Sequence, residues 1–165
     1  MTTNLKFTSL ASRFNALVFT LFLTVVAQAF AASQAEVVLP KNGDTHLFTK
    51  SKRIAPLQIV TSGEKAHYFV KLFSADSNKT VQTVFVRSGE TVTTKVPLGS
   101  YGIKYAAGQN WNGDQQLFGE ETQFFEAEKR FDFIREGNEI QGFRIELILQ
   151  PGGNLSTRQI PKADW

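Results

Sequence analysis

Hydrophobic and polar side chains alternate at every second position in several stretches after Pro56. Side chains on one face of a β-strand recur with period two, whereas an amphipathic helix needs apolar positions every three or four residues. We therefore predict strands with one face in a core, and we find no helical apolar stripe after residue 31. The clearest alternating stretches are 68–72, 92–96, 101–105, 131–134 and 143–149.

Turn-forming pairs and triplets separate these stretches at short intervals. Short strands at this spacing predict an all-β fold, an antiparallel β-sandwich of about seven or eight strands. Ser88-Gly89 separates two β-prone runs, 80–87 and 90–96, which favours a hairpin at that point. Residues 120–130 are charged enough for a helical turn, but Phe124-Phe125 favours a strand. The turn signals are Ser62-Gly63, Asp76-Ser77-Asn78, Ser88-Gly89, Gly99-Ser100 and Gly137-Asn138.

The first 31 residues follow a different pattern. Lys6 and Arg13 are their only charged residues, an apolar run follows at 16–26, and small residues then occupy A27-Q-A-F-A-A32. This order is the signature of a secretory signal peptide, with cleavage after Ala31 or, alternatively, after Ala29. The apolar run is shorter than the roughly 20 residues that span a bilayer, which favours a cleaved signal helix over an uncleaved anchor.

The predicted organisation has four parts: a signal peptide at 1–31, an N-terminal arm at 32–55, a β-sandwich domain at 56–150 and a C-terminal tail at 151–165. The mature protein is expected to be periplasmic or secreted, with no membrane span. The chain has 18 basic and 15 acidic residues, and removal of the signal peptide leaves 16 basic residues, a net charge near +1. This balance gives no support to nucleic-acid binding, and the oligomeric state stays open.

The composition excludes many chemistries. The absence of cysteine excludes disulfides, zinc–thiolate sites and a cysteine nucleophile. The chain also has no nucleophile elbow, no phosphate-binding loop and no dinucleotide fingerprint. His46 and His67 are the only histidines and lack the spacing of a metal site. We therefore expect no cofactor, no metal and no enzymatic activity.

The least strand-like stretch is the loop at 107–119, A-G-Q-N-W-N-G-D-Q-Q-L-F-G. A tryptophan flanked by amides and a carboxylate can stack on a sugar ring or anchor a partner protein. Gly108 and Gly113 would act as conformational joints. The alternative is that Trp111 and Phe118 fold back as plugs over an open end of the sandwich. The candidate binding residues are Trp111, Asn110, Asn112, Asp114, Gln116 and Phe118.

Residues 87–105 read R-S-G-E-T-V-T-T-K-V-P-L-G-S-Y-G-I-K-Y. This string resembles the central hairpin of transthyretin-like sandwiches, the carboxypeptidase regulatory-like and Cna-B-type domains. Pro97 lacks an N–H and ends pairing, Gly99 permits a sharp turn, and Tyr101 returns a large ring to the core. The resemblance implies the fold and no particular activity. The longer run through Phe118-Gly119 resembles a group of uncharacterised bacterial exported proteins.

These observations favour a non-enzymatic exported binding module that holds a protein or glycan of the cell envelope through the 107–119 loop. An envelope inhibitor or accessory protein would be one form of it. One alternative is a structural subunit of a surface assembly, which pairs through an edge strand or the terminal segments. The other is a hydrolase that uses Asp114 and Glu120.

Overall fold

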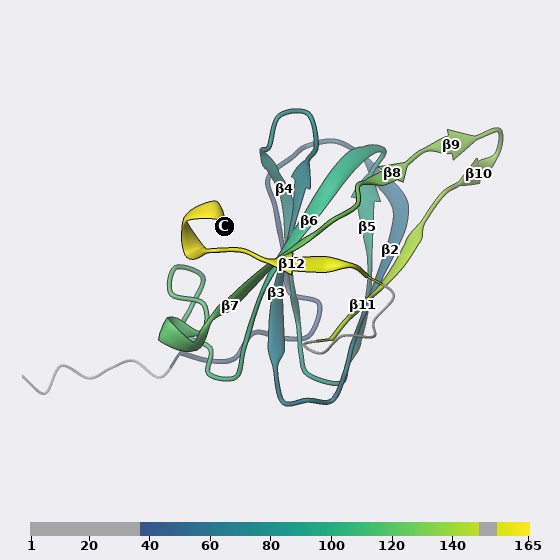
Figure 1. Ribbon diagram of the computed structural model, residues 1–165. Coiled ribbons are helices and arrows are strands. Elements are labelled where there is room, and N and C mark those ends of the chain that lie inside the picture. Colours follow the sequence, from purple (N-terminus) through teal and green to yellow (C-terminus); the bar gives the residue numbers. More distant parts are fainter. Residues whose placement is uncertain (1–36, 149–154) are drawn as a thin grey trace, which may run out of the picture. The chain divides into compact units, whose positions relative to one another are not determined.

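A computed structural model describes residues 37–148 and 155–165 of the chain. The predicted signal peptide lies outside them. The described residues form an all-β, sandwich-like fold of two main sheets (Figure 1). Its two helical elements are single 3₁₀ turns, η1 (Gly119–Glu121) and η2 (Lys162–Asp164).

The larger sheet has seven strands in the order β1-β4-β3-β6-β7-β12, with β8 also paired to β6. All of its pairs are antiparallel. Its strands are β1 (Thr45–Leu47), β3 (His67–Ser74), β4 (Thr80–Val86), β6 (Gly99–Gly108), β7 (Gln123–Ala127), β8 (Phe131–Phe133) and β12 (Thr157–Gln159).

The smaller sheet has the order β11-β2-β5, from β11 (Phe143–Leu147), β2 (Arg53–Thr61) and β5 (Thr91–Pro97). Its β11–β2 pair is parallel, a departure from the all-antiparallel prediction. The short hairpin of β9 (Arg135–Glu136) and β10 (Glu139–Ile140) projects from the rest of the fold (Figure 1). The described residues hold twelve strands, more than the expected seven or eight, and five of the twelve have only two or three residues.

The main core lies between the two sheets and confirms the period-two pattern. Tyr68, Val70 and Leu72 of β3 are buried in one cluster with Leu57 and Ile59 of β2. On both strands the residues between them point to the opposite face, because successive side chains of a strand alternate. The alternation along the chain therefore marks which side of each strand faces the core.

The predicted hairpin at Ser88-Gly89 is wrong, and the strands on either side of Pro97-Gly99 form no hairpin either, because β5 and β6 lie in different sheets. β4 belongs to the larger sheet and β5 to the smaller one, so the turn at Ser88-Gly89 connects the two sheets. The hydrogen-bonding edges of β4 are occupied by β1 and β3, and β5 pairs with β2. Alternation identifies the buried face of a strand but not its neighbour, and a short turn is compatible with either connection.

The next connection also crosses between the sheets, from β5 to β6. Gly99 has φ +146°, a backbone conformation that favours glycine. The hydroxyl of Tyr101, itself 6% exposed, donates a hydrogen bond to the Leu98 carbonyl at 3.1 Å. The tyrosine ring thus closes the turn that the glycine permits.

Both segments outside the expected sandwich domain contribute strands to it. The predicted arm at 32–55 contains β1 and the start of β2, and the predicted tail at 151–165 contains β12 and η2. The C-terminal segment (residues 155–165) crosses β7 as the last strand of the larger sheet. It therefore lies beside the loop between β6 and β7, which holds the candidate binding residues.

Candidate functional site

A second hydrophobic cluster covers part of the outer face of the larger sheet. Phe69, Phe85, Ala106 and Phe124 project from four neighbouring strands on the side away from the main core. Residues from three other segments cover them, so this part of the sheet is buried on both faces. The covering residues are Leu39, then Trp111, Leu117 and Phe118 of the β6–β7 loop, then Ile160 and Trp165 of the C-terminal segment.

Trp111 lies within this second cluster and is only 8% exposed. Its ring centroid is 4.9 Å from that of Phe85 in an edge-on contact, 5.4 Å from that of Phe118 and 5.6 Å from that of Phe69. These contacts correspond to the plug interpretation, although the plug covers a sheet face rather than an open end. A partner could not reach the indole face without displacing the loop.

Phe118 holds the other end of the loop against β6. A Cβ atom at Gly108 would lie 2.4 Å from Cβ of Phe118, so glycine is required for this close approach. Within the loop, the Leu117 N–H donates to the Gly113 carbonyl at 2.7 Å. Thr122 Oγ1 accepts from the Phe118 N–H at 3.1 Å and donates to the Gly119 carbonyl at 2.7 Å. Packing and hydrogen bonds together fix the loop.

The polar candidates of the same loop point outward. Asn110, Asn112, Asp114 and Gln116 are all exposed, and the Asn112 amide donates to the Asn110 carbonyl at 3.2 Å. The structure therefore separates the predicted site into a buried aromatic pair and an exposed polar set. The polar set is available to a partner, and the aromatic pair supports it from beneath.

An open cleft of about 480 Å³ lies between this loop and the C-terminal segment. Phe124 and Ile160, both nearly buried, form its apolar base. Of the predicted residues, Gln116 lines the cleft, whereas Trp111, Asn110, Asn112, Asp114 and Phe118 do not. The other lining residues are Gln115, Gly119, Glu120, Thr122, Gln159 and Lys162.

Sequence reasoning missed Gln159 and Lys162. They come from the C-terminal segment, more than forty positions after Gln116, and reach the cleft because β12 pairs with β7. No local motif marks them, since their position depends on that strand pairing. The one signal in the sequence that this segment packs on the domain was Ile160, an apolar residue among polar ones. In the structure it packs with the aromatic residues of the loop in the second cluster.

The carboxylates of the hydrolase alternative do not share the cleft. Glu120 lines it and Asp114 does not, and both side chains are exposed. Within 37–148 and 155–165, no group of three or more His, Asp or Glu residues is placed to hold a metal ion. No helix in these same ranges is long and apolar enough to span a membrane.

His67 has a structural role at the turn between β4 and β5. Its Nδ1 accepts a hydrogen bond from the Ser88 N–H at 3.1 Å. Burial, and secondarily the charge of Arg87, lower the pKa of His67 below 6.5. The neutral ring therefore helps to hold the connection between the two sheets.

The chain matches no family model, no curated protein and no solved structure.

Proposed function

We propose that this chain is an exported, non-enzymatic binding module that holds a protein or a glycan in the cleft beside the β6–β7 loop. The observation that carries this proposal is the cleft of about 480 Å³ between the loop and the C-terminal segment. It lies beside the stretch in which the sequence concentrates exposed amides. Loops held on a rigid β-sandwich are common places for binding sites.

The side chains of the cleft suit a ligand with many hydrogen-bonding groups. Gln115, Gln116 and Gln159 each offer an amide donor and acceptor, and Glu120 and Lys162 add one charge of each sign. Hydroxyls of a sugar or peptide groups of a protein would match these amides. An apolar base with a few convergent polar groups is the usual composition of a binding site.

In this proposal the two buried aromatic residues act as positioning residues rather than contacts. Trp111 and Phe118 pack on Phe85 and hold the loop at a fixed distance from the C-terminal segment. A preformed cleft loses less conformational entropy when it binds its ligand.

Export to the periplasm or the outside is the part of the proposal that rests on the signal-peptide pattern at 1–31. A transthyretin-like relationship is likewise proposed. Support for it comes from the resemblance of residues 87–105, in which Gly99 and Tyr101 form a tight turn, although this turn joins the two sheets and closes no hairpin.

Binding by matched variants tests the proposal. The chain from residue 32 onward is immobilised and exposed to cell-envelope extract and to a panel of glycans. We expect Gln116→Ala and Gln159→Ala each to reduce ligand retention at least about tenfold, because each removes amide contacts worth about 1.4 kcal/mol or more. Gln141→Ala, an exposed glutamine after β10, is the control and should retain the ligand. Equal retention by all variants, or retention of nothing by the wild type, would contradict the proposal.

A structural subunit of a surface assembly is the second candidate, and the free edge of β5 favours it. Within the described part of the chain, this seven-residue strand pairs with β2 on one side only. An open edge can pair with a strand of another copy. A concentration-dependent series of oligomers in size-exclusion chromatography would support assembly, and a single sharp monomer peak would exclude it.

A further inference from the structure

A row of charged side chains crosses the outer face of the larger sheet next to the second hydrophobic cluster. Lys71, Lys104, Glu126 and Arg158 lie on four neighbouring strands, β3, β6, β7 and β12. Each is the direct cross-strand partner of the next. The row therefore brings three positive charges and one negative charge to a single level of the sheet.

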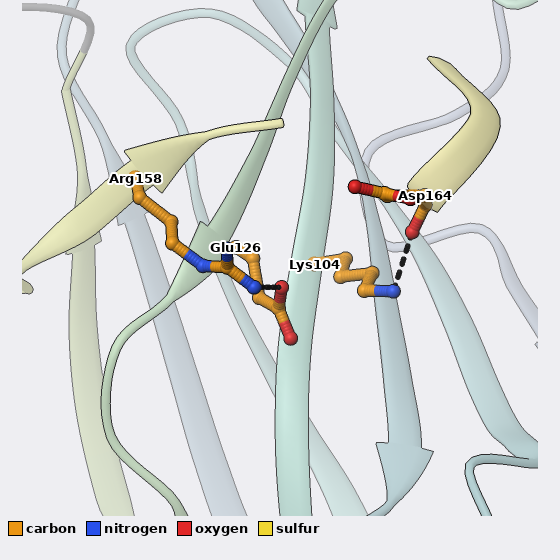
Figure 2. Close-up of polar contacts among 4 residues, drawn as sticks. All are labelled: Lys104, Glu126, Arg158 and Asp164. Carbon is orange, nitrogen blue, oxygen red and sulfur yellow. Dashed lines mark hydrogen bonds and ion pairs between the residues drawn. The ribbon is translucent and has the colours of Figure 1, made fainter. Parts of the chain in front are cut away.

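The single carboxylate of this row is already engaged. Arg158 Nη2 lies 2.6 Å from Glu126 Oε2, and Figure 2 shows the two side chains facing each other. Lys71 and Lys104 form no ion pair with any carboxylate of the described residues. Like charges placed directly opposite one another across strands are destabilising. The two lysines therefore place two positive charges side by side, and the one carboxylate of the row is already paired with Arg158.

Neutral groups of the C-terminal segment hold the two lysines. Lys104 Nζ donates to the main-chain carbonyl of Asp164 at 2.5 Å (Figure 2), and Lys71 Nζ lies 4.0 Å from the ring centroid of Trp165. Burial, together with the charge of Lys104, lowers the pKa of Lys71. An ammonium has three donors, so Lys104 keeps two that the Asp164 carbonyl does not use.

A second hollow, of about 430 Å³, opens at this row. The residues that line it are Asn78, Lys104, Glu126, Arg158, Ala163, Asp164 and Trp165. Its lining carries two positive charges, on Lys104 and Arg158, and two negative charges, on Glu126 and Asp164. Lys71, which does not line the hollow, adds a third positive charge from the neighbouring strand.

We propose that this hollow is a binding site for a small oxyanion, a phosphate or carboxylate group, held between Lys104 and Arg158. Lys71 adds charge from the neighbouring strand, Asn78 supplies a neutral donor, and the Trp165 ring offers an apolar surface to the rest of the ligand. Ammonium and guanidinium groups bind such oxyanions through short charge-assisted hydrogen bonds. The site is separate from the cleft of the proposed function and does not depend on it.

The two tryptophans of the chain provide the readout. Inorganic phosphate and succinate are titrated separately into the chain from residue 32 onward at constant ionic strength, with sodium chloride as the reference salt. In proton–nitrogen NMR spectra, the indole N–H of Trp165 should shift with saturation, and that of Trp111 should not. A shift of the Trp165 resonance with phosphate alone, or with succinate alone, identifies which oxyanion the site prefers. Either of these two results supports the proposed site.

Variants separate the site from general attraction of anions. Lys104→Gln should weaken the titrated anion at least tenfold, whereas Lys95→Gln, an exposed lysine of the smaller sheet, should leave its affinity unchanged. If Lys104→Gln fails to fold, Arg158→Gln repeats the test, because that side chain is 61% exposed. The proposal would be refuted if neither anion shifts the indole N–H resonance of Trp165. It would also be refuted if Lys104→Gln and Lys95→Gln bind the anion with equal affinity.

Discussion

At the residue scale, the ring of Trp111 holds the β6–β7 loop onto the larger sheet. It packs edge-on against Phe85 and Phe118, and it is 8% exposed. Its importance for binding would therefore be indirect, because it fixes the loop whose amides line the cleft.

Replacement of Trp111 by alanine tests this role. We expect the free energy of unfolding to fall by about 3–5 kcal/mol, the usual cost of removing a large buried aromatic side chain. Trp111→Phe keeps a ring against Phe85, so its free energy of unfolding should fall by clearly less than that of the alanine variant. Urea denaturation of both variants measures the difference. A loss under about 1 kcal/mol for the alanine variant would mean that the ring does not support the loop.

His67 makes stability depend on pH. Its folded-state pKa is lowered, chiefly by burial, so the unfolded chain binds the proton more readily. The free energy of unfolding contributed by His67 is therefore complete above about pH 6.5. It is lost progressively as the pH falls through that value toward the folded pKa.

Urea midpoints at pH 7.5 and pH 5.5 measure this contribution. We expect a smaller decrease for His67→Gln than for the wild type, because glutamine can still accept a hydrogen bond from the Ser88 N–H but does not titrate. Equal decreases in both proteins would show that His67 is not the responsible group.

At the element scale, the close approach of the loop to β6 depends on Gly108. A Cβ atom there would lie 2.4 Å from Cβ of Phe118, which cannot move without moving the loop backbone. Gly108→Ala should therefore cost about 1–3 kcal/mol, as overpacked sites do. Gly63 is the matched control, because a Cβ atom there meets nothing within 4 Å. Thermal unfolding of Gly108→Ala and Gly63→Ala measures the loss of stability in each. An equal loss in the two variants would contradict the close approach of Phe118 to Gly108.

The elements also show how far sequence reasoning reaches. Alternation located the buried faces of β3, β5, β6 and β11, because a strand repeats every two residues. It did not identify strand neighbours, so the predicted hairpin at Ser88-Gly89 was wrong. The sequence also holds apolar residues on the opposite face of these strands, Phe69, Phe85 and Phe124. They indicated that the larger sheet is covered on both faces, and the prediction of a single buried face did not take them into account.

At the scale of the whole molecule, the C-terminal segment completes the larger sheet and forms one wall of each candidate site. Ile160 is buried against the loop aromatics, and its N–H donates to the Phe124 carbonyl at 2.9 Å. Gln159 and Lys162 of the same segment line the cleft. Because these two residues reach the cleft only through a distant strand pairing, the sequence predicted Gln116 as a site residue but did not predict Gln159 or Lys162.

Removal of residues 156–165 tests this dependence. We expect the free energy of unfolding to fall by at least about 2 kcal/mol, the value of burying one large aliphatic side chain. Binding of a hydrophobic dye should rise, because Phe124 and Phe69 lose their cover. An unchanged unfolding midpoint without dye binding would show that the segment does not seal this face.

The most direct test of the central claim is a hydrogen-exchange footprint of the chain from residue 32 onward, measured alone and with the ligand that it retains. We predict that the ligand slows exchange at 115–122 and 159–162 and leaves the β9–β10 hairpin unchanged. Protection confined to another part of the molecule, such as the edge of β5, would contradict binding in the cleft.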